Sequence, residues 1–87
     1  MENTYEFNII FNKIKQIVIE NDPVGLIDGG APHDEYDDQI FQLIKLIGKV
    51  EVLEELASNV YKIFDKEFEE MVKIDQCRRI AELILQK

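Results

Sequence analysis

Apolar residues recur along this chain at the three- and four-residue spacing that lines one face of an α-helix. The pattern is interrupted three times and therefore predicts four helices. The first helix is expected from Thr4 to Asn21. Its apolar stripe consists of Phe7, Ile10, Phe11, Ile14, Ile17 and Val18. We expect this helix to end at Asn21-Asp22-Pro23, because the residue before a proline avoids the helical region.

The second helix is expected to follow Pro32 and to run to about Lys49. Its stripe consists of Tyr36, Ile40, Leu43, Ile47 and Val50. Gly48 marks its end, since glycine is common just past a helix. The third helix starts from Val50, with the stripe Leu53, Leu56, Ala57, Val60, Ile63 and Phe64. The fourth helix carries Ile74, Cys77, Ile80, Ala81, Ile84 and Leu85 on one broad face.

The boundary between the third and fourth helices is the least marked, because no glycine or proline separates them. We place the break between Asp65 and Glu70, where the third stripe falls out of register with Ile74 and Ala81. One long bent helix is the alternative. No segment shows the two-residue alternation of a strand. The pattern predicts an all-α fold, a compact bundle of four short helices with a Gly/Pro loop between helices 1 and 2, in a single domain 1–87.

Composition narrows the function classes. A hydrophobic share of 46% is enough to fill one core, and it argues against disorder. The net charge of −8 repels phosphate backbones, so we expect no nucleic-acid partner and favour a basic protein partner. No apolar run approaches the roughly 20 residues of a membrane span. With no signal peptide in the sequence, we expect a cytoplasmic protein without a membrane segment. The lone Cys77 is expected to be a small buried apolar residue.

The segment "DPVGLIDGGAPHDEYDDQI", residues 22–40, is the one stretch that does not follow the helical pattern. Leu26 and Ile27 are apolar within a polar loop and should cover the end of the bundle. Asp34 is a natural N-cap for the second helix, and Asp37 should reach back as in a capping box. Carboxylates at that helix start are also favoured by the helix dipole. Helix capping and solubility are therefore one interpretation of these acidic residues.

A docking surface is the second reading of the same acids. No lysine or arginine occurs between Lys15 and Lys45, so negative charge gathers at one end of the bundle. Clustered charge speeds encounter with a partner of opposite sign and selects for it. The candidate partner-binding residues are Asp22, Asp28, Asp34, Glu35, Tyr36, Asp37 and Asp38. Tyr36 would serve as an aromatic anchor if its ring is exposed, although its place on the apolar stripe favours burial.

A different class of function is a divalent-cation-binding or hydrolytic protein that uses His33, Asp34, Asp37 and Asp38. Such a site requires those side chains to converge. A calcium loop starting at Asp22 fails, because its third and fifth positions are Val24 and Leu26 rather than oxygen ligands. Catalysis by His33 lacks a neighbouring nucleophile. We therefore expect a protein that is not an enzyme, with no cofactor and no metal site.

A third possibility is a homodimer that buries an apolar patch made of Ile9, Ile19 and Phe41, which lie off the main stripes.

The same signature resembles that of the small bacterial YugE-like family of uncharacterised helical proteins. The family pattern is a helix ending in "DP-x-GL", a "GAP" loop, then "DEY" and an isoleucine. It is matched here by Asp22, Pro23, Gly25, Leu26, Gly30, Ala31, Pro32, Asp34, Glu35, Tyr36 and Ile40. The resemblance covers about a fifth of the chain closely. It implies a compact all-helical domain and no particular activity.

A second resemblance is to the small acidic helical immunity proteins that block colicin nucleases. It rests on size, charge and helix number. Their "DxxYYP" segment is missing here, since Tyr61 is followed by Lys62. The function predicted is a protein-interaction module that binds a basic partner, with an immunity or antitoxin role as one specific version.

Overall fold

The computed structural model describes the backbone of residues 4–86 and the side chains of residues 6–86. It contains the four helices α1 Thr4–Asn21, α2 Asp37–Ile44, α3 Leu53–Glu67 and α4 Ile74–Gln86. No strand occurs in that part of the chain. The radius of gyration is 12.4 Å, against about 12 Å for a compact chain of this length. The predicted all-α bundle is confirmed.

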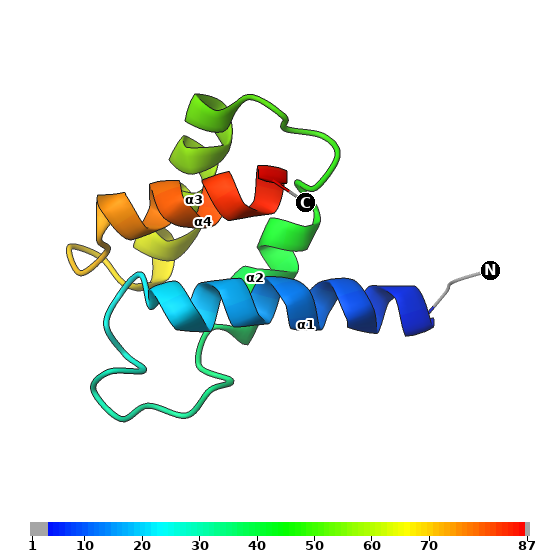
Figure 1. The fold of residues 1–87 in the computed structure, drawn as a ribbon. Coiled ribbons are helices and arrows are strands. Elements are labelled where there is room, and N and C mark those ends of the chain that lie inside the picture. Colours follow the sequence, from blue (N-terminus) through cyan, green and yellow to red (C-terminus); the bar gives the residue numbers. More distant parts are fainter. Residues whose placement is uncertain (1–3, 87) are drawn as a thin grey trace.

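Figure 1 shows how the helices pack. The contact between α3 and α4 is the most extensive, and the two are joined by a short connection. The first helix lies alongside α4 and runs in the opposite direction. The short α2 packs against both α1 and α3. The long loop between α1 and α2 therefore closes one end of the bundle.

The core is built from the apolar stripes that the sequence predicts. Its fully buried members are Ile14, Val18, Val24, Tyr36, Ile40, Leu43, Leu56, Val60, Phe64, Cys77, Ile80, Ala81 and Ile84. Leu26 and Ile27 from the loop pack against this cluster, as expected. Three stripe residues are exposed: Ile10 by 39%, Ile74 by 66% and Leu85 by 36%. Ile10 lies in the N-terminal part of α1, which extends past the other helices in Figure 1.

The second helix is shorter than predicted at both ends. Residues 33–36 form a turn instead, with Glu35 N donating to Pro32 O and Asp37 N donating to Asp34 O. Tyr36 has φ −100° and ψ 9°, outside the α-helical region. Residues 45–49 form further turns, and Gly48 takes a φ of +84°, which a glycine adopts without strain. The predicted end at Gly48 thus marks the end of the turns rather than of the helix.

The third and fourth helices are separate. Residues 68–73 join them, and Glu70 has a φ of +66°, which no α-helix contains. The break lies close to the predicted interval, so the alternative of one long bent helix is wrong.

Candidate functional site

The loop between α1 and α2 is organised around Asp22 and Tyr36. The Tyr36 hydroxyl donates to Asp22 Oδ1 over 2.7 Å and accepts from Val24 N at 3.2 Å and Leu26 N at 3.4 Å. The Asp22 carboxylate also accepts from Ile27 N at 3.0 Å and Asp28 N at 2.9 Å. Two side chains fourteen residues apart therefore satisfy four backbone N–H groups of the loop between them.

The backbone and the core hold this pair in place. Asp22 adopts a φ of +46°, a left-handed conformation that aspartate tolerates better than most residues. The Tyr36 ring is 0% exposed. It makes edge-to-face contacts with Phe64 and Phe68 at centroid distances of 5.5 and 5.9 Å. The hydroxyl thus extends from the hydrophobic core to the polar loop.

The environment shifts the pKa of both groups. Burial, followed by the hydrogen bond to Asp22, raises the pKa of Tyr36 to about 12. Partial burial acts to raise the pKa of Asp22. The hydrogen bonds from Asp28 N, the Tyr36 hydroxyl and Ile27 N, together with the charge on Lys73, outweigh it and lower that pKa below 3.8. At neutral pH the pair is therefore a phenol donating to a carboxylate.

A second contact ties the loop to the connection between α3 and α4. Lys73 N, just before α4, donates to Pro23 O over 2.8 Å. Gly25 follows with a φ of +84°, and a Cβ there would lie 3.5 Å from Lys73 Nζ. Gly30, with a φ of +100°, provides the second reversal. The conformation of the loop is therefore fixed from α2, from α4 and from its own glycines.

Of the seven predicted partner-binding residues, Tyr36 and Asp22 are engaged inside the loop, and a third, Asp37, pairs with Lys15. Tyr36 is fully buried, so its ring is not the exposed aromatic anchor that docking requires. Asp22 accepts three hydrogen bonds inside the loop and is only partly exposed. Both residues act in folding the loop, because their polar atoms are satisfied within it.

The capping prediction for Asp34 and Asp37 was wrong. The N-cap position of α2 is Tyr36, with no side-chain capping bond. Asp37 instead faces α1, where its Oδ1 lies 3.1 Å from Lys15 Nζ. Asp37 and Asp38 do lie in the first turn of α2, as expected, where the helix dipole favours negative charge.

The remaining candidates form what we call the acidic surface: Asp28, Asp34, Glu35 and Asp38. All four are exposed. Within residues 6–86, none of the four makes an ion pair. The acidic surface therefore presents three solvated carboxylates on a loop whose backbone is anchored, and a fourth, Asp38, in the first turn of α2.

The predicted cation or hydrolytic site does not assemble. Among the described residues, no three His, Cys, Asp or Glu side chains come together as metal ligands would. Asp37, one of the proposed ligands, is turned toward Lys15. His33 is exposed. This arrangement counts against the reading of His33, Asp34, Asp37 and Asp38 as one site.

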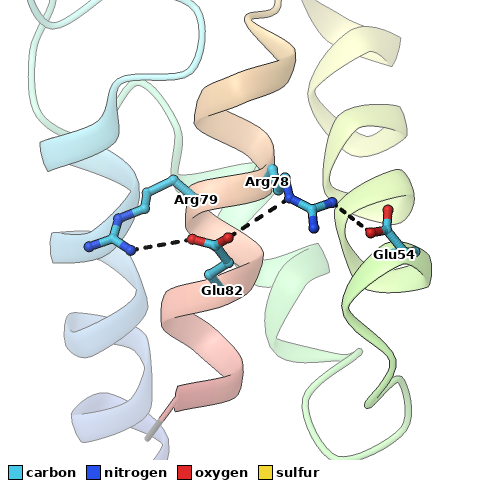
Figure 2. Close-up of polar contacts among 4 residues, drawn as sticks. All are labelled: Glu54, Arg78, Arg79 and Glu82. Carbon is cyan, nitrogen blue, oxygen red and sulfur yellow. Dashed lines mark hydrogen bonds and ion pairs between the residues drawn. The ribbon is translucent and has the colours of Figure 1, made fainter.

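Elsewhere on the molecule, both arginines lie close to carboxylates. Figure 2 shows Arg78 on α4 between two carboxylates, 2.8 Å from Glu54 on α3 and 3.8 Å from Glu82 on its own helix. Arg79 lies 3.3 Å from the same Glu82 and projects toward α1. These pairs are well exposed, so each is worth only about 0–1 kcal/mol.

The predicted apolar patch is divided. Phe41 is 44% exposed and lies against Phe7 and Phe11, at centroid distances of 6.0 and 4.9 Å. Ile9 is 50% exposed. It is two residues from each of these phenylalanines, hence on the opposite side of α1. Ile9 and Phe41 therefore do not share one surface.

Three of these interactions could not be predicted from the sequence: the Asp22–Tyr36 pair, the Lys15–Asp37 ion pair and the bond from Lys73 to Pro23. Each joins residues outside any helical repeat. The only available signal was that Asp22 and Tyr36 both belong to the signature segment.

The fold and this site define a small all-α protein. Internal hydrogen bonds hold the loop between α1 and α2 in place, and this loop and the start of α2 carry an acidic surface. A family model described as "Domain of unknown function (DUF1871)" matches residues 10–87. The chain therefore belongs to this family, and its membership agrees with the predicted uncharacterised helical family. Comparison with curated proteins and with solved structures found no match. None of the described helices is long and apolar enough to cross a membrane.

Proposed function

We propose that this protein is a small interaction module, without catalytic activity of its own, that binds a basic protein partner through the acidic surface. One observation carries the proposal: four exposed carboxylates, unpaired within residues 6–86, stand on the loop or in the adjoining first turn of α2, and buried hydrogen bonds hold that loop in place. A loop that is already ordered loses little conformational entropy when it binds. Clustered charge of one sign also accelerates encounter with an oppositely charged partner.

Finer aspects belong to the same proposal. We propose that the family matched here is the YugE-like family, and that the protein works in the bacterial cytoplasm without nucleic acid, membrane or cofactor. The signature residues that carry the resemblance include Asp22 and Tyr36, whose roles in this proposal are structural. An immunity or antitoxin role is one specific version, in which the basic partner is a toxin.

The test compares three forms of the protein as bait in a bacterial cytoplasmic extract. The first is the intact chain. The second is the loop variant Asp28→Asn, Asp34→Asn, Glu35→Gln and Asp38→Asn. The matched control changes four exposed glutamates elsewhere: Glu51→Gln, Glu55→Gln, Glu67→Gln and Glu69→Gln. Both variants neutralise four carboxylates, so each moves the net charge from −8 to −4. Circular dichroism first checks that all three forms are equally helical.

We expect the intact chain and the control variant to retain the same basic protein from the extract. The loop variant should not retain it. Retention of this basic protein should fall as salt is added, because exposed charges are screened over about 10 Å at 0.1 M salt. Equal retention by all three forms would contradict a role for the acidic surface. Equal loss from both variants would assign binding to net charge rather than to this loop.

A further inference from the structure

The outward side of α2 carries three exposed residues in a defined order. Asp38, Phe41 and Lys45 are all exposed. They are spaced by three and then four residues, which places them within about 60° of one another around a helix. Lys45 is the C-cap residue and has φ −65° and ψ −18°, so it still follows the helical path. Along one side of α2, an acidic residue is thus followed by an aromatic residue and then by a basic residue.

Phe41, at the centre of this order, is the one exposed aromatic side chain among residues 6–86. Its ring is 44% exposed although it stacks on Phe7, with an interplanar angle of 11°, and contacts Phe11. The two underlying rings hold it in one position, so little side-chain entropy remains to be lost on binding. Aromatic residues held in this way are common anchors of protein interfaces.

The two ends of this side differ in charge and lack local partners. Within residues 6–86 neither Asp38 nor Lys45 makes an ion pair, whereas the preceding Asp37 is engaged by Lys15. At the Lys45 end, a groove of about 400 Å³ lies between α2 and α3 and extends the basic surface. No acidic residue lines it, and its cations are Lys45, Lys62 and Lys66. In a chain with eighteen acids and ten bases, three lysines around one groove favour a negatively charged occupant.

We propose that this face is self-complementary and that its occupant is a second copy of the chain, related by a two-fold axis. Asp38 and Lys45 are equidistant from a point between Phe41 and Gln42. An axis there makes two antiparallel copies of α2 face each other, and each Asp38 then meets the second copy's Lys45. Phe41 lies half a residue, about 0.75 Å along the helix, from that point. The two Phe41 rings therefore meet beside the axis, as an isologous interface requires.

The strength of this dimer is limited by its size and by net charge. A standard interface buries about 800 Å² per partner, roughly one seventh of the 5741 Å² surface of this chain. Both copies carry −8, and this self-repulsion opposes association. We expect a dissociation constant in the range of about 1–100 µM, at the weak end for interfaces of this size.

Sedimentation equilibrium of the purified chain, over a concentration range bracketing those values, measures the dimer directly. Asp38→Lys and Lys45→Asp each place like charges opposite each other twice. Each alone should weaken association about tenfold or more. An equimolar mixture of the two variants should associate again as a heterodimer, since every contact then joins opposite charges. The double variant should recover the homodimer for the same reason.

Matched controls separate this contact from net charge. Glu55→Lys and Lys13→Asp change exposed residues on α3 and α1. They shift the net charge by the same amounts as the two test variants, so any change in affinity that they cause measures the effect of net charge alone, which should be much smaller. Phe41→Ser should abolish dimerisation. Phe41 also supports Phe7 and Phe11, so circular dichroism first checks that the Phe41→Ser variant is still folded. If that variant is not folded, the charge variants alone test the interface.

A monomer at every concentration would overturn the proposal. A dimer whose affinity is unchanged in Asp38→Lys and Lys45→Asp would also overturn it and would place the interface elsewhere. The experiment needs no other protein, so its outcome is independent of the proposed function. A dimer of this kind would engage Asp38 and leave Asp28, Asp34 and Glu35 of the acidic surface for a partner.

Discussion

Replacing Tyr36 by phenylalanine isolates the contribution of one hydroxyl group to stability. The ring and its contacts with Phe64 and Phe68 remain, so no large cavity forms. The change removes the donor to Asp22 and the acceptor of the buried N–H of Val24. We therefore expect a loss that comes from hydrogen bonding alone.

The magnitude follows from the groups left without partners. An unsatisfied buried N–H at Val24 costs about 1–3 kcal/mol. The lost bond to the Asp22 carboxylate contributes about 1.5–3 kcal/mol. Leu26 N, at 3.4 Å and only partly buried, adds little. Because the bonds share one hydroxyl they are not additive, and we expect a total of about 3 kcal/mol. That is a large part of the roughly 5–15 kcal/mol that stabilises a domain.

Urea unfolding at pH 7, followed by circular dichroism, measures this difference. The matched control is Tyr61→Phe, because Tyr61 is partly exposed and its hydroxyl makes no hydrogen bond within residues 6–86. The control should change the unfolding free energy by less than about 0.5 kcal/mol. A Tyr36→Phe variant as stable as the control would refute the reasoning, because the hydroxyl would then contribute nothing to the loop.

The pH dependence offers a second readout of the same hydroxyl. The pKa of Tyr36 is raised to about 12 in the folded protein, from 10.0. Between those values the native state binds the proton more tightly than the unfolded state. Stability is therefore fully present below pH 10 and falls as pH rises toward 12. The full shift corresponds to about 3 kcal/mol. Tyr36→Phe should lack this part of the alkaline destabilisation.

Three further predictions concern the loop and the core. Asp22→Asn should lower the free energy of unfolding by about 2–3 kcal/mol at pH 7. Because the pKa of Asp22 is lowered below 3.8 in the folded protein, this difference from the wild type should shrink as pH falls through that lowered value. A difference that stays constant down to pH 2 would contradict this. Gly25→Ala should destabilise by about 1–2 kcal/mol because of its φ of +84°, whereas Gly29→Ala, whose φ is not positive, should cost less in the same urea titration. Cys77 is 1% exposed, and burial raises its pKa to about 11. A thiol reagent should therefore label it only at the rate of unfolding. Rapid labelling of the native protein would be inconsistent with this burial.

Helix number and most of the core could be predicted from the sequence because they depend on local periodicity. Ile14, Val18, Val60 and Phe64 recur at the helical repeat, and a residue on that repeat must face whatever the helix packs against. Ile10 shows the limit of the pattern. It belongs to the stripe but stays 39% exposed, since α1 extends past its neighbours.

The acidic surface could be predicted only in part. Composition located the carboxylates between Lys15 and Lys45, and the exposed residues Asp28, Asp34, Glu35 and Asp38 remain candidates. The sequence could not separate them from Asp22 and Asp37. Those two have the same side chain, but one bonds to the loop backbone and the other to Lys15. Which carboxylate is free depends on what lies beside it in space.

The sequence by itself determined an acidic four-helix protein, because helical periodicity and charge are properties of the chain alone. The tertiary structure decided the role of the signature segment. Asp22 and Tyr36 are fourteen residues apart and share no repeat, so their 2.7 Å bond exists only once α1, α2 and α3 bring the loop and the tyrosine ring together. The physical reason is that buried N–H groups of a loop require acceptors, and only the folded chain supplies them from distant residues.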